Sequence, residues 1–133
     1  MRVMLNTNVL VSHIFFRSAI TKRFFAELSQ GHTIVLCDYV VEELRLVTER
    51  KFPQMAYKLD RFFTALSFEM VYTPRKIISD AVPEMRDEKD SPILATAILE
   101  DIDVFVTWDK DFLVLDVDKP EIMTMTEFIE AGY

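Results

Sequence analysis

The sequence contains little glycine, cysteine or histidine, and each shortage excludes a class of site. Only two of the 133 residues are glycine, too few for the glycine-rich loops that bind dinucleotides or nucleoside triphosphates. The single cysteine, Cys37, cannot form an internal disulfide and is expected to be a small buried apolar residue, as suits the cytoplasm. The two histidines, His13 and His32, form no cluster with cysteine, so zinc is not expected.

Long hydrophobic runs are also missing. No stretch of about 18 apolar residues occurs, so no membrane-spanning helix and no membrane partner are predicted. Residues 1–16 are apolar but are interrupted by Asn6, Asn8 and His13, and they lack a small-residue cleavage site. They are therefore predicted to form a strand and a helix of the mature fold. Half of the residues are hydrophobic, which together with the length predicts one domain over residues 1–133 with a buried core.

Apolar runs that suit buried strands alternate with stretches of helical periodicity. Helix caps are expected at Thr7 or Asn8, Ser18, Asp38 and Thr126, and a further helix is expected to open at Asp90. The alternation implies an α/β fold with a central parallel sheet between two layers of helices. The predicted strands are residues 2–5, 33–36, 68–72, 104–107 and 122–125, and the predicted helices are residues 9–16, 20–30, 38–51, 55–66 and 90–100 and a terminal helix.

Polar side chains follow two of the predicted strands, and others stand at or before a helix start. In parallel sheets, ligands bind beyond the carboxyl ends of the strands. If the first strand and the 104–107 strand are neighbours, the following residues should converge at one edge: Asn6, Asn8, Asp87, Asp90, Asp109 and Asp111.

The helix predicted over residues 38–51 adds one more acid. At about 100° per residue, Glu43 lies roughly 60° from Val40, on the border of the apolar stripe that also contains Leu44. Glu42 and Glu49 lie near the opposite side and are predicted to be solvated. Glu43 is therefore the glutamate best placed to lean inward, although a border glutamate can also be purely structural.

Converging carboxylates repel one another, and a hard divalent cation removes that penalty. Mg²⁺ and Mn²⁺ prefer oxygen ligands, and in such sites they orient a water and stabilise charge on a phosphate. Each acid also has an ordinary interpretation. Asp90 can cap its helix, Asp109 can begin a turn, and Asp87 and Asp111 can be solvated or accessory.

Charge is distributed unevenly along the chain. Residues 80–118 hold 12 acidic and 3 basic residues, whereas residues 1–79 hold 7 acidic and 11 basic residues. The acidic segment is interpreted as a solvated loop or as part of a site. The net charge of −7 is unfavourable for non-specific attraction to nucleic acid. Arg17, Lys22 and Arg23 are candidates for binding phosphates beside the acids, with a solvated helix face as the alternative.

Four stretches resemble the PIN-domain family, in the family's order and over nearly the whole chain: "MLNTNVLVS", "DYVVEELRLV", "RDEKDSPILATAI" and "VFVTWDKDFL". The resemblance is to the branch that acts as toxins of toxin–antitoxin pairs. It implies a parallel sheet of about five strands, Mg²⁺- or Mn²⁺-dependent hydrolysis of RNA, an antitoxin partner and a possible homodimer. Carried over by position, it implies that Glu43, Asp90 and Asp109 are core metal-site acids, that Asp87 and Asp111 are accessory, and that the hydroxyl of Thr7 supports the site.

The chain departs from the family at its first acid. The usual "DTN" after the first strand is "NTN" here, so Asn6 stands at the aspartate position. An amide offers a carbonyl oxygen without charge, which should weaken the binding of a divalent cation. Asn6 marks either a degraded, inactive member of the family or an engineered inactive form. Both interpretations predict an impaired nuclease.

Two other functions compete with the nuclease. A catalytically inactive RNA- or protein-binding module on the same scaffold is favoured by Asn6 and opposed by the remaining acids. A receiver or phosphatase-like domain needs an aspartate after the first strand and is disfavoured by its absence. The pairs Phe15–Phe16 and Phe24–Phe25 are interpreted as core residues or as an interface patch.

Overall fold

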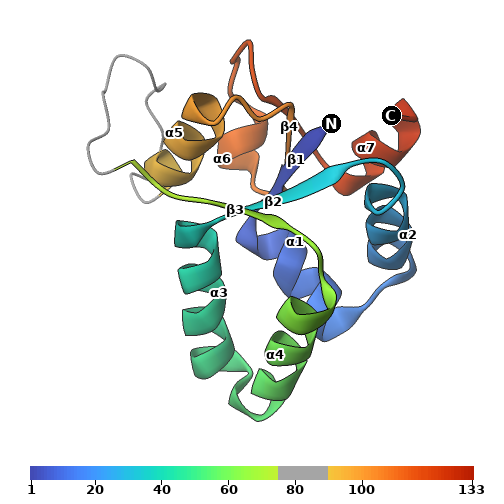
Figure 1. Ribbon diagram of the computed structural model, residues 1–133, viewed down its shortest axis with the longest axis vertical. Coiled ribbons are helices and arrows are strands. Elements are labelled where there is room, and N and C mark those ends of the chain that lie inside the picture. The colour runs from blue at the N-terminus through green and yellow to red at the C-terminus, as the bar shows by residue number, and fades with distance from the viewer. Residues whose placement is uncertain (75–89) are drawn as a thin grey trace.

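Five parallel strands form the sheet at the centre of the computed structural model, which describes residues 1–74 and 90–133. Their order across the sheet is β3-β2-β1-β4-β5, and all neighbours are parallel (Figure 1). The predicted parallel sheet is confirmed, and each predicted range is correct to within two residues. The strands are β1 (Arg2–Leu5), β2 (Thr33–Cys37), β3 (Glu69–Val71), β4 (Val104–Val106) and β5 (Glu121–Met123).

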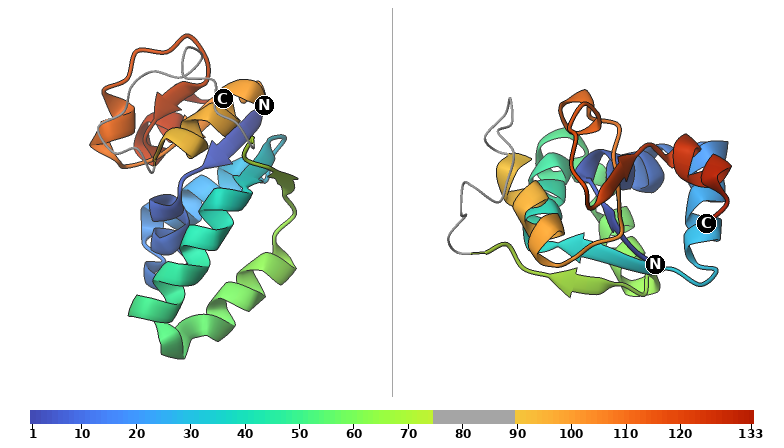
Figure 2. Two further views of the ribbon diagram at one scale, coloured as in Figure 1. Left: turned by 90° about the vertical axis from the view of Figure 1, so that its left-hand side faces the viewer. Right: turned by 90° about the horizontal axis from the view of Figure 1, so that it is seen from above.

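Helices cover both faces of this sheet (Figure 1, Figure 2). One layer contains α1 (Thr7–Val11), which continues as the π-helix η1 (Ser12–Phe16), together with α3 (Asp38–Lys51) and α4 (Ala56–Ala65). The other layer contains α5 (Ser91–Leu99) and α6 (Lys110–Leu113). At one end of the molecule, α2 (Ala19–Leu28) packs against the C-terminal helix α7 (Met125–Ala131), and a short turn, η2 (Pro53–Met55), joins α3 to α4.

The direction of the crossovers explains the two layers. The chain moves from β1 to β2 to β3 in one direction across the sheet, and then returns to place β4 on the other side of β1. Connections between parallel strands are almost always right-handed, so reversing the direction moves the connecting helices to the opposite face. The reversal also creates a switch point between β1 and β4, where ligands bind in sheets of this kind.

The predicted capping residues of α1 and α3 are wrong, although both helices begin where predicted to within one or two residues. The cap of α1 is Asn6 rather than Thr7 or Asn8, because the Asn6 side-chain oxygen accepts a hydrogen bond from the Thr7 backbone N–H at 2.9 Å. Asp38 is the first residue of α3 and does not cap it. Its carboxylate instead accepts bonds from the backbone N–H and the hydroxyl of Thr73, both at 2.7 Å, and these bonds hold the pKa of Asp38 below its ordinary value despite desolvation.

Of the other two predicted caps, Ser18 is confirmed and Thr126 is wrong. Ser18 caps α2, as predicted, by accepting a bond from the N–H of Thr21 at 3.4 Å. The terminal helix begins earlier than predicted, because Thr124 rather than Thr126 is its cap. Thr124 and Glu127 form a reciprocal capping box, which satisfies two backbone N–H groups that the first turn would otherwise leave unpaired.

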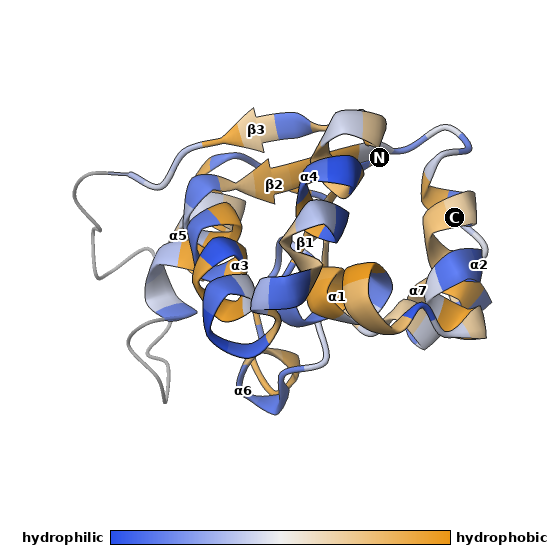
Figure 3. Ribbon diagram, turned by 90° about the horizontal axis from the view of Figure 1, so that it is seen from below, coloured by the Kyte–Doolittle hydropathy of each residue, from blue (hydrophilic) through white to orange (hydrophobic). Residues whose placement is uncertain are grey.

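The core follows the hydrophobic pattern. Along α3, hydrophilic and hydrophobic residues are mixed, whereas α1 is mostly hydrophobic (Figure 3). Cys37 is fully buried, as expected. Phe15, Phe24 and Phe25 are also buried, and each exposes at most 9% of its surface. Phe16 differs from these three phenylalanines because 66% of it is exposed. No helix in the described part of the chain is long and apolar enough to cross a membrane.

Candidate metal-binding site

The carboxyl ends of β1 and β4 lie side by side. Leu5 pairs with Val106 in the parallel register, and the backbone N–H of Asn6 continues the ladder by donating to the Val106 carbonyl at 3.0 Å. The residues that follow these two strands are therefore neighbours in space, although they are about 100 positions apart in the sequence. This confirms the adjacency of strands on which the predicted site depended.

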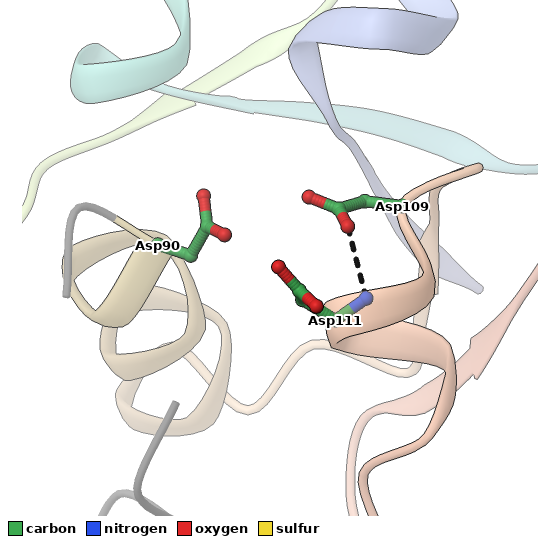
Figure 4. A group of neighbouring side chains, drawn as sticks. All are labelled: Asp90, Asp109 and Asp111. Carbon is green, nitrogen blue, oxygen red and sulfur yellow. Dashed lines mark hydrogen bonds between the residues drawn. The ribbon is translucent and has the colours of Figure 1, made fainter. Parts of the chain in front are cut away.

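Three carboxylates meet at this edge. Oxygen atoms of Asp90, Asp109 and Asp111 all lie within 4.8 Å of one another, and the three side chains point toward a common space (Figure 4). Asp109 also caps α6, since one of its oxygens accepts the N–H of Asp111 at 2.9 Å. Asp90 stands at the start of α5 but makes no capping bond there, so capping does not account for its presence.

Glu43 approaches the same space from α3. It lines an open pocket of about 470 Å³ together with Asn6, Asp90 and Asp109. Glu43 is half-buried, whereas Glu42 and Glu49 are exposed, as the helical periodicity predicts. The pocket thus receives one acid from within α3 and one from the start of each of α5 and α6.

Asn6 is 5% exposed and uses both ends of its amide within the protein. Its oxygen caps α1, and its nitrogen donates to the hydroxyl of Thr107 at 2.8 Å. The same hydroxyl accepts the backbone N–H of Asp109 at 3.0 Å and the side-chain nitrogen of Asn8 at 3.4 Å. Thr107 is fully buried and therefore links the residues after β1 to the first acid after β4.

Sequence reasoning missed this role of Thr107. The available signal was a hydroxyl residue at the end of a buried strand, two positions before Asp109. That signal predicts a local turn or cap. Only the placement of β4 beside β1 shows that the hydroxyl also reaches Asn6.

Residues 2–111 match the protein-family model that describes the PIN domain. The chain belongs to the PIN-domain family. Among solved structures, the VapBC2 complex from Rickettsia felis, bound to a DNA fragment from its promoter, contains a chain similar to this PIN domain. The identity is 24% and the TM-score 0.71, with 92% of this chain and 97% of that chain covered.

A second similar structure is VapC20 of Mycobacterium tuberculosis, a toxin that cleaves the sarcin–ricin loop. It is 15% identical to this PIN domain, with a TM-score of 0.62, and the match covers 84% of this chain and 92% of that one. At these identities the likeness shows the fold. No curated protein sequence matches the PIN domain described here.

The donor set of this PIN domain suits a hard divalent cation. The lining residues offer carboxylate and amide oxygens, which Mg²⁺ and Mn²⁺ prefer. Thr7 also lines the pocket, and its buried hydroxyl oxygen has no hydrogen-bond partner among the described residues. An unsatisfied buried hydroxyl is costly, and water around a bound cation would offer it a partner.

The remaining predicted site residues lie elsewhere. Asp87 falls outside the described residues. Arg17 lines a different pocket, between η1 and α4, and Lys22 and Arg23 are exposed on α2, where Arg23 pairs with Glu27 at 3.5 Å. Their role in binding RNA stays a prediction.

Proposed function

We propose that this PIN domain is a metal-dependent endoribonuclease, the toxin of a toxin–antitoxin pair, and that Asn6 lowers its activity. The observation that carries the proposal is the convergence of Asp90, Asp109 and Asp111 within 4.8 Å. Two of these acids, Asp90 and Asp109, line one pocket together with Glu43. Like-charged groups at such distances repel one another, and they are held together here by separate helix starts. A site that gathers several carboxylates within this distance suits a divalent cation.

Glu43, Asp90 and Asp109 would hold Mg²⁺ or Mn²⁺, with Asp111 and Asn6 beside them. A bound ion of this kind activates water and stabilises the charge that develops on a phosphate. The protein's part is to hold the acids in place. Thr107 positions Asn6 and Asp109 through one hydroxyl, and the Asp109 cap orients its carboxylate relative to Asp111. No histidine lines the pocket among the described residues, which suits chemistry without a general-base imidazole.

Asn6 is the weak point of this site. An aspartate here would still cap α1, because its carboxylate accepts the Thr7 N–H as the amide does. It could not donate to Thr107, but the threonine hydroxyl can rotate and donate to the carboxylate instead. Asn6→Asp is therefore compatible with the surrounding hydrogen bonds and adds a full negative charge to the pocket.

The test is Asn6→Asp. We expect Mn²⁺ to bind at least about tenfold more tightly, because attraction between close charges in a partly screened site is on the order of a few kcal/mol and only part of it is offset by repulsion from the other acids. Metal-dependent cleavage of single-stranded RNA should appear or rise strongly, and expressing cells should grow more slowly. Trp108, the only tryptophan, precedes Asp109 in the chain and is 42% exposed, so its fluorescence can report Mn²⁺ binding.

Asn8→Asp is the matched control, since it adds the same charge two residues away on the same pocket wall. It should give a smaller gain than Asn6→Asp if position 6 is the ligand position. A folded Asn6→Asp protein that binds Mn²⁺ no better and cuts no RNA across a broad substrate panel would contradict the nuclease.

In that case the better account is a catalytically inactive module that binds RNA or protein, a function that the uncharged Asn6 already favours. The proposal of an antitoxin partner is supported by the similarity to the VapBC2 structure. Co-expression of the Asn6→Asp protein with its antitoxin should restore growth.

Self-association remains a prediction, which the mass of the protein in concentrated solution would test.

A further inference from the structure

The side chains of α3 that line the pocket change from acidic to apolar to basic along the helix. Glu43, Val47 and Lys51 all line it, at spacings of four residues that place them on the same side of the helix. At 1.5 Å of rise per residue, Glu43 and Lys51 stand about 12 Å apart along the helix. The pocket is therefore acidic at one end, apolar in its middle and positively charged at the other end.

An aromatic wall stands beside the positive end. Phe16 and Phe52 both line the pocket, and their rings meet edge to face at 5.8 Å and 82°. Phe52 is held from behind, because it stacks on the buried ring of Phe15 at 4.5 Å and 15°. Phe16 exposes 66% of its surface, although its neighbour Phe15 is 8% exposed. The wall thus presents one accessible ring on a rigid support.

Neither feature is needed to hold a metal ion. Lys51 is the only basic residue lining the pocket in the described part of the chain, and it stands away from the acidic cluster. A cation next to an accessible aromatic ring suits a chain in which a negative group and a flat apolar group alternate. A nucleic-acid strand has this character, with its phosphates and bases.

We infer that Phe16 stacks on an unpaired base of the RNA while Lys51 contacts an adjacent phosphate, so that a phosphodiester further along the strand lies at the acidic end of the pocket. The inference rests on the proposed nuclease function and makes it more specific: it assigns Phe16 and Lys51 the role of holding the RNA strand beside the acids. Every base has a flat face that can stack on an aromatic ring. In a duplex both faces are covered by neighbouring bases, so a paired strand cannot use Phe16.

Binding to a short fluorescein-labelled RNA of mixed sequence tests the stacking. The experiment uses the chain as it stands, with Asn6, in the presence of Mg²⁺. Phe16→Ala should weaken binding roughly 5- to 150-fold, the range measured for the loss of one base–aromatic stack. Phe16→Trp should retain the parent affinity, and the same RNA annealed to its complement should bind weakly to all variants.

Tyr57→Ala is the matched control, because it removes an exposed aromatic ring from the other pocket. It should leave RNA affinity within about twofold of the parent. Since the Phe16 ring is largely exposed, Phe16→Ala should also retain the parent's circular dichroism and thermal midpoint. An RNA with an abasic site at the stacked position should bind Phe16→Ala and the parent equally.

A second pair of variants tests the phosphate contact. Lys51→Gln should reduce the slope of log affinity against log salt by about 0.7, the value for one contact to a single strand. Arg50→Gln removes the same charge from the adjacent position, which does not line the pocket, and should leave the slope nearly unchanged.

The stacking and the nuclease can fail separately. If Phe16→Ala binds RNA as tightly as the parent, or the parent binds no single-stranded RNA, the inference is overturned, and contact with a protein partner becomes the account of the exposed ring. The nuclease is judged independently by whether Asn6→Asp cleaves RNA with Mn²⁺. A double variant, Asn6→Asp with Phe16→Ala, that cleaves at the rate of Asn6→Asp alone under limiting RNA would leave the nuclease standing without the stacking.

Discussion

The two ends of the central sheet use charge in opposite ways. At the amino ends of the strands, Arg2 forms two hydrogen bonds with Glu69, at 2.7 and 3.2 Å, and its backbone N–H donates to Asp103 at 2.8 Å. Lys119 approaches the same Asp103 at 3.3 Å. At the carboxyl ends, three carboxylates approach within 4.8 Å of one another.

The pKa values agree with a structural role for the paired end. The hydrogen bond from Arg2 and the nearby Lys119 lower the pKa of Asp103, and the hydrogen bond to Glu69 raises the pKa of Arg2. These charges are satisfied within the chain and need no ligand. Opposite charges paired inside the protein therefore mark a structural contact, whereas several carboxylates gathered at one end of a pocket suit a cation from outside.

The largest expected effect comes from neutralising an acid at the carboxyl end. Asp109→Asn keeps the cap of α6, because asparagine also accepts the Asp111 N–H. We expect Mn²⁺ binding to weaken at least about tenfold, and the metal-free protein to become about 1 kcal/mol more stable as repulsion is relieved. Titration by calorimetry and urea unfolding in EDTA measure the two quantities.

Asp90→Asn should act in the same direction on the metal. Asp60→Asn, on the exposed surface of α4, is the control and should change neither quantity by much. Unchanged binding isotherms for both Asp90→Asn and Asp109→Asn would rule out these acids as the metal site.

The next effect concerns the buried hydroxyl that organises the carboxyl end. Thr107→Val keeps the shape of the side chain but leaves the nitrogen of Asn6 and the N–H of Asp109 without their acceptor. The loss of stability should be about 1–3 kcal/mol, the usual cost of unsatisfied buried donors, and Mn²⁺ should bind more weakly. Thr107→Ser retains the hydroxyl and should keep metal affinity near the parent value. Equal affinities in Thr107→Val and the parent would show that this hydroxyl does not position the ligands.

At the amino end the same chemical change should have the opposite sign. Asp103→Asn should destabilise the protein near pH 7, by about 1 kcal/mol or less because the pair is partly exposed. The pKa of Asp103 is lower in the folded chain than its ordinary value of 3.8, so its contribution is present above that value and is lost as pH falls through the folded pKa. Urea unfolding of the parent and the variant should therefore differ at pH 7 and converge under strongly acidic conditions. If Asp103→Asn stabilised the protein at pH 7, the proposed structural role of the charges at the amino ends of the strands would be contradicted.

The smallest effect is expected from the basic residues outside the acidic pocket. Replacing Arg17, Lys22 and Arg23 together with glutamine should weaken RNA binding less than about tenfold, through loss of general attraction to phosphates. RNA affinity measured over a range of salt concentrations tests this. A loss larger than that caused by Lys51→Gln would place the RNA along η1 and α2.

Much of the arrangement follows from local patterns. Alternating apolar runs and helical periods predicted the parallel sheet, and the angle of Glu43 relative to Val40 predicted the half-buried glutamate. The errors occur where a polar side chain has more than one partner within reach. Asp38 binds Thr73, which is 35 positions away, instead of capping its own helix. No local pattern could reveal that partner.

The sequence by itself determined the apolar stripe of α3 and which strands end in polar groups, because side-chain direction follows from the period of a helix or a strand. The tertiary structure alone decided that β4 lies beside β1, that Thr107 reaches Asn6, and that Phe16 stays exposed while Phe15 is buried. These outcomes depend on how elements far apart in the chain pack against one another. Packing depends on the shapes of both partners, whereas periodicity depends on one segment at a time.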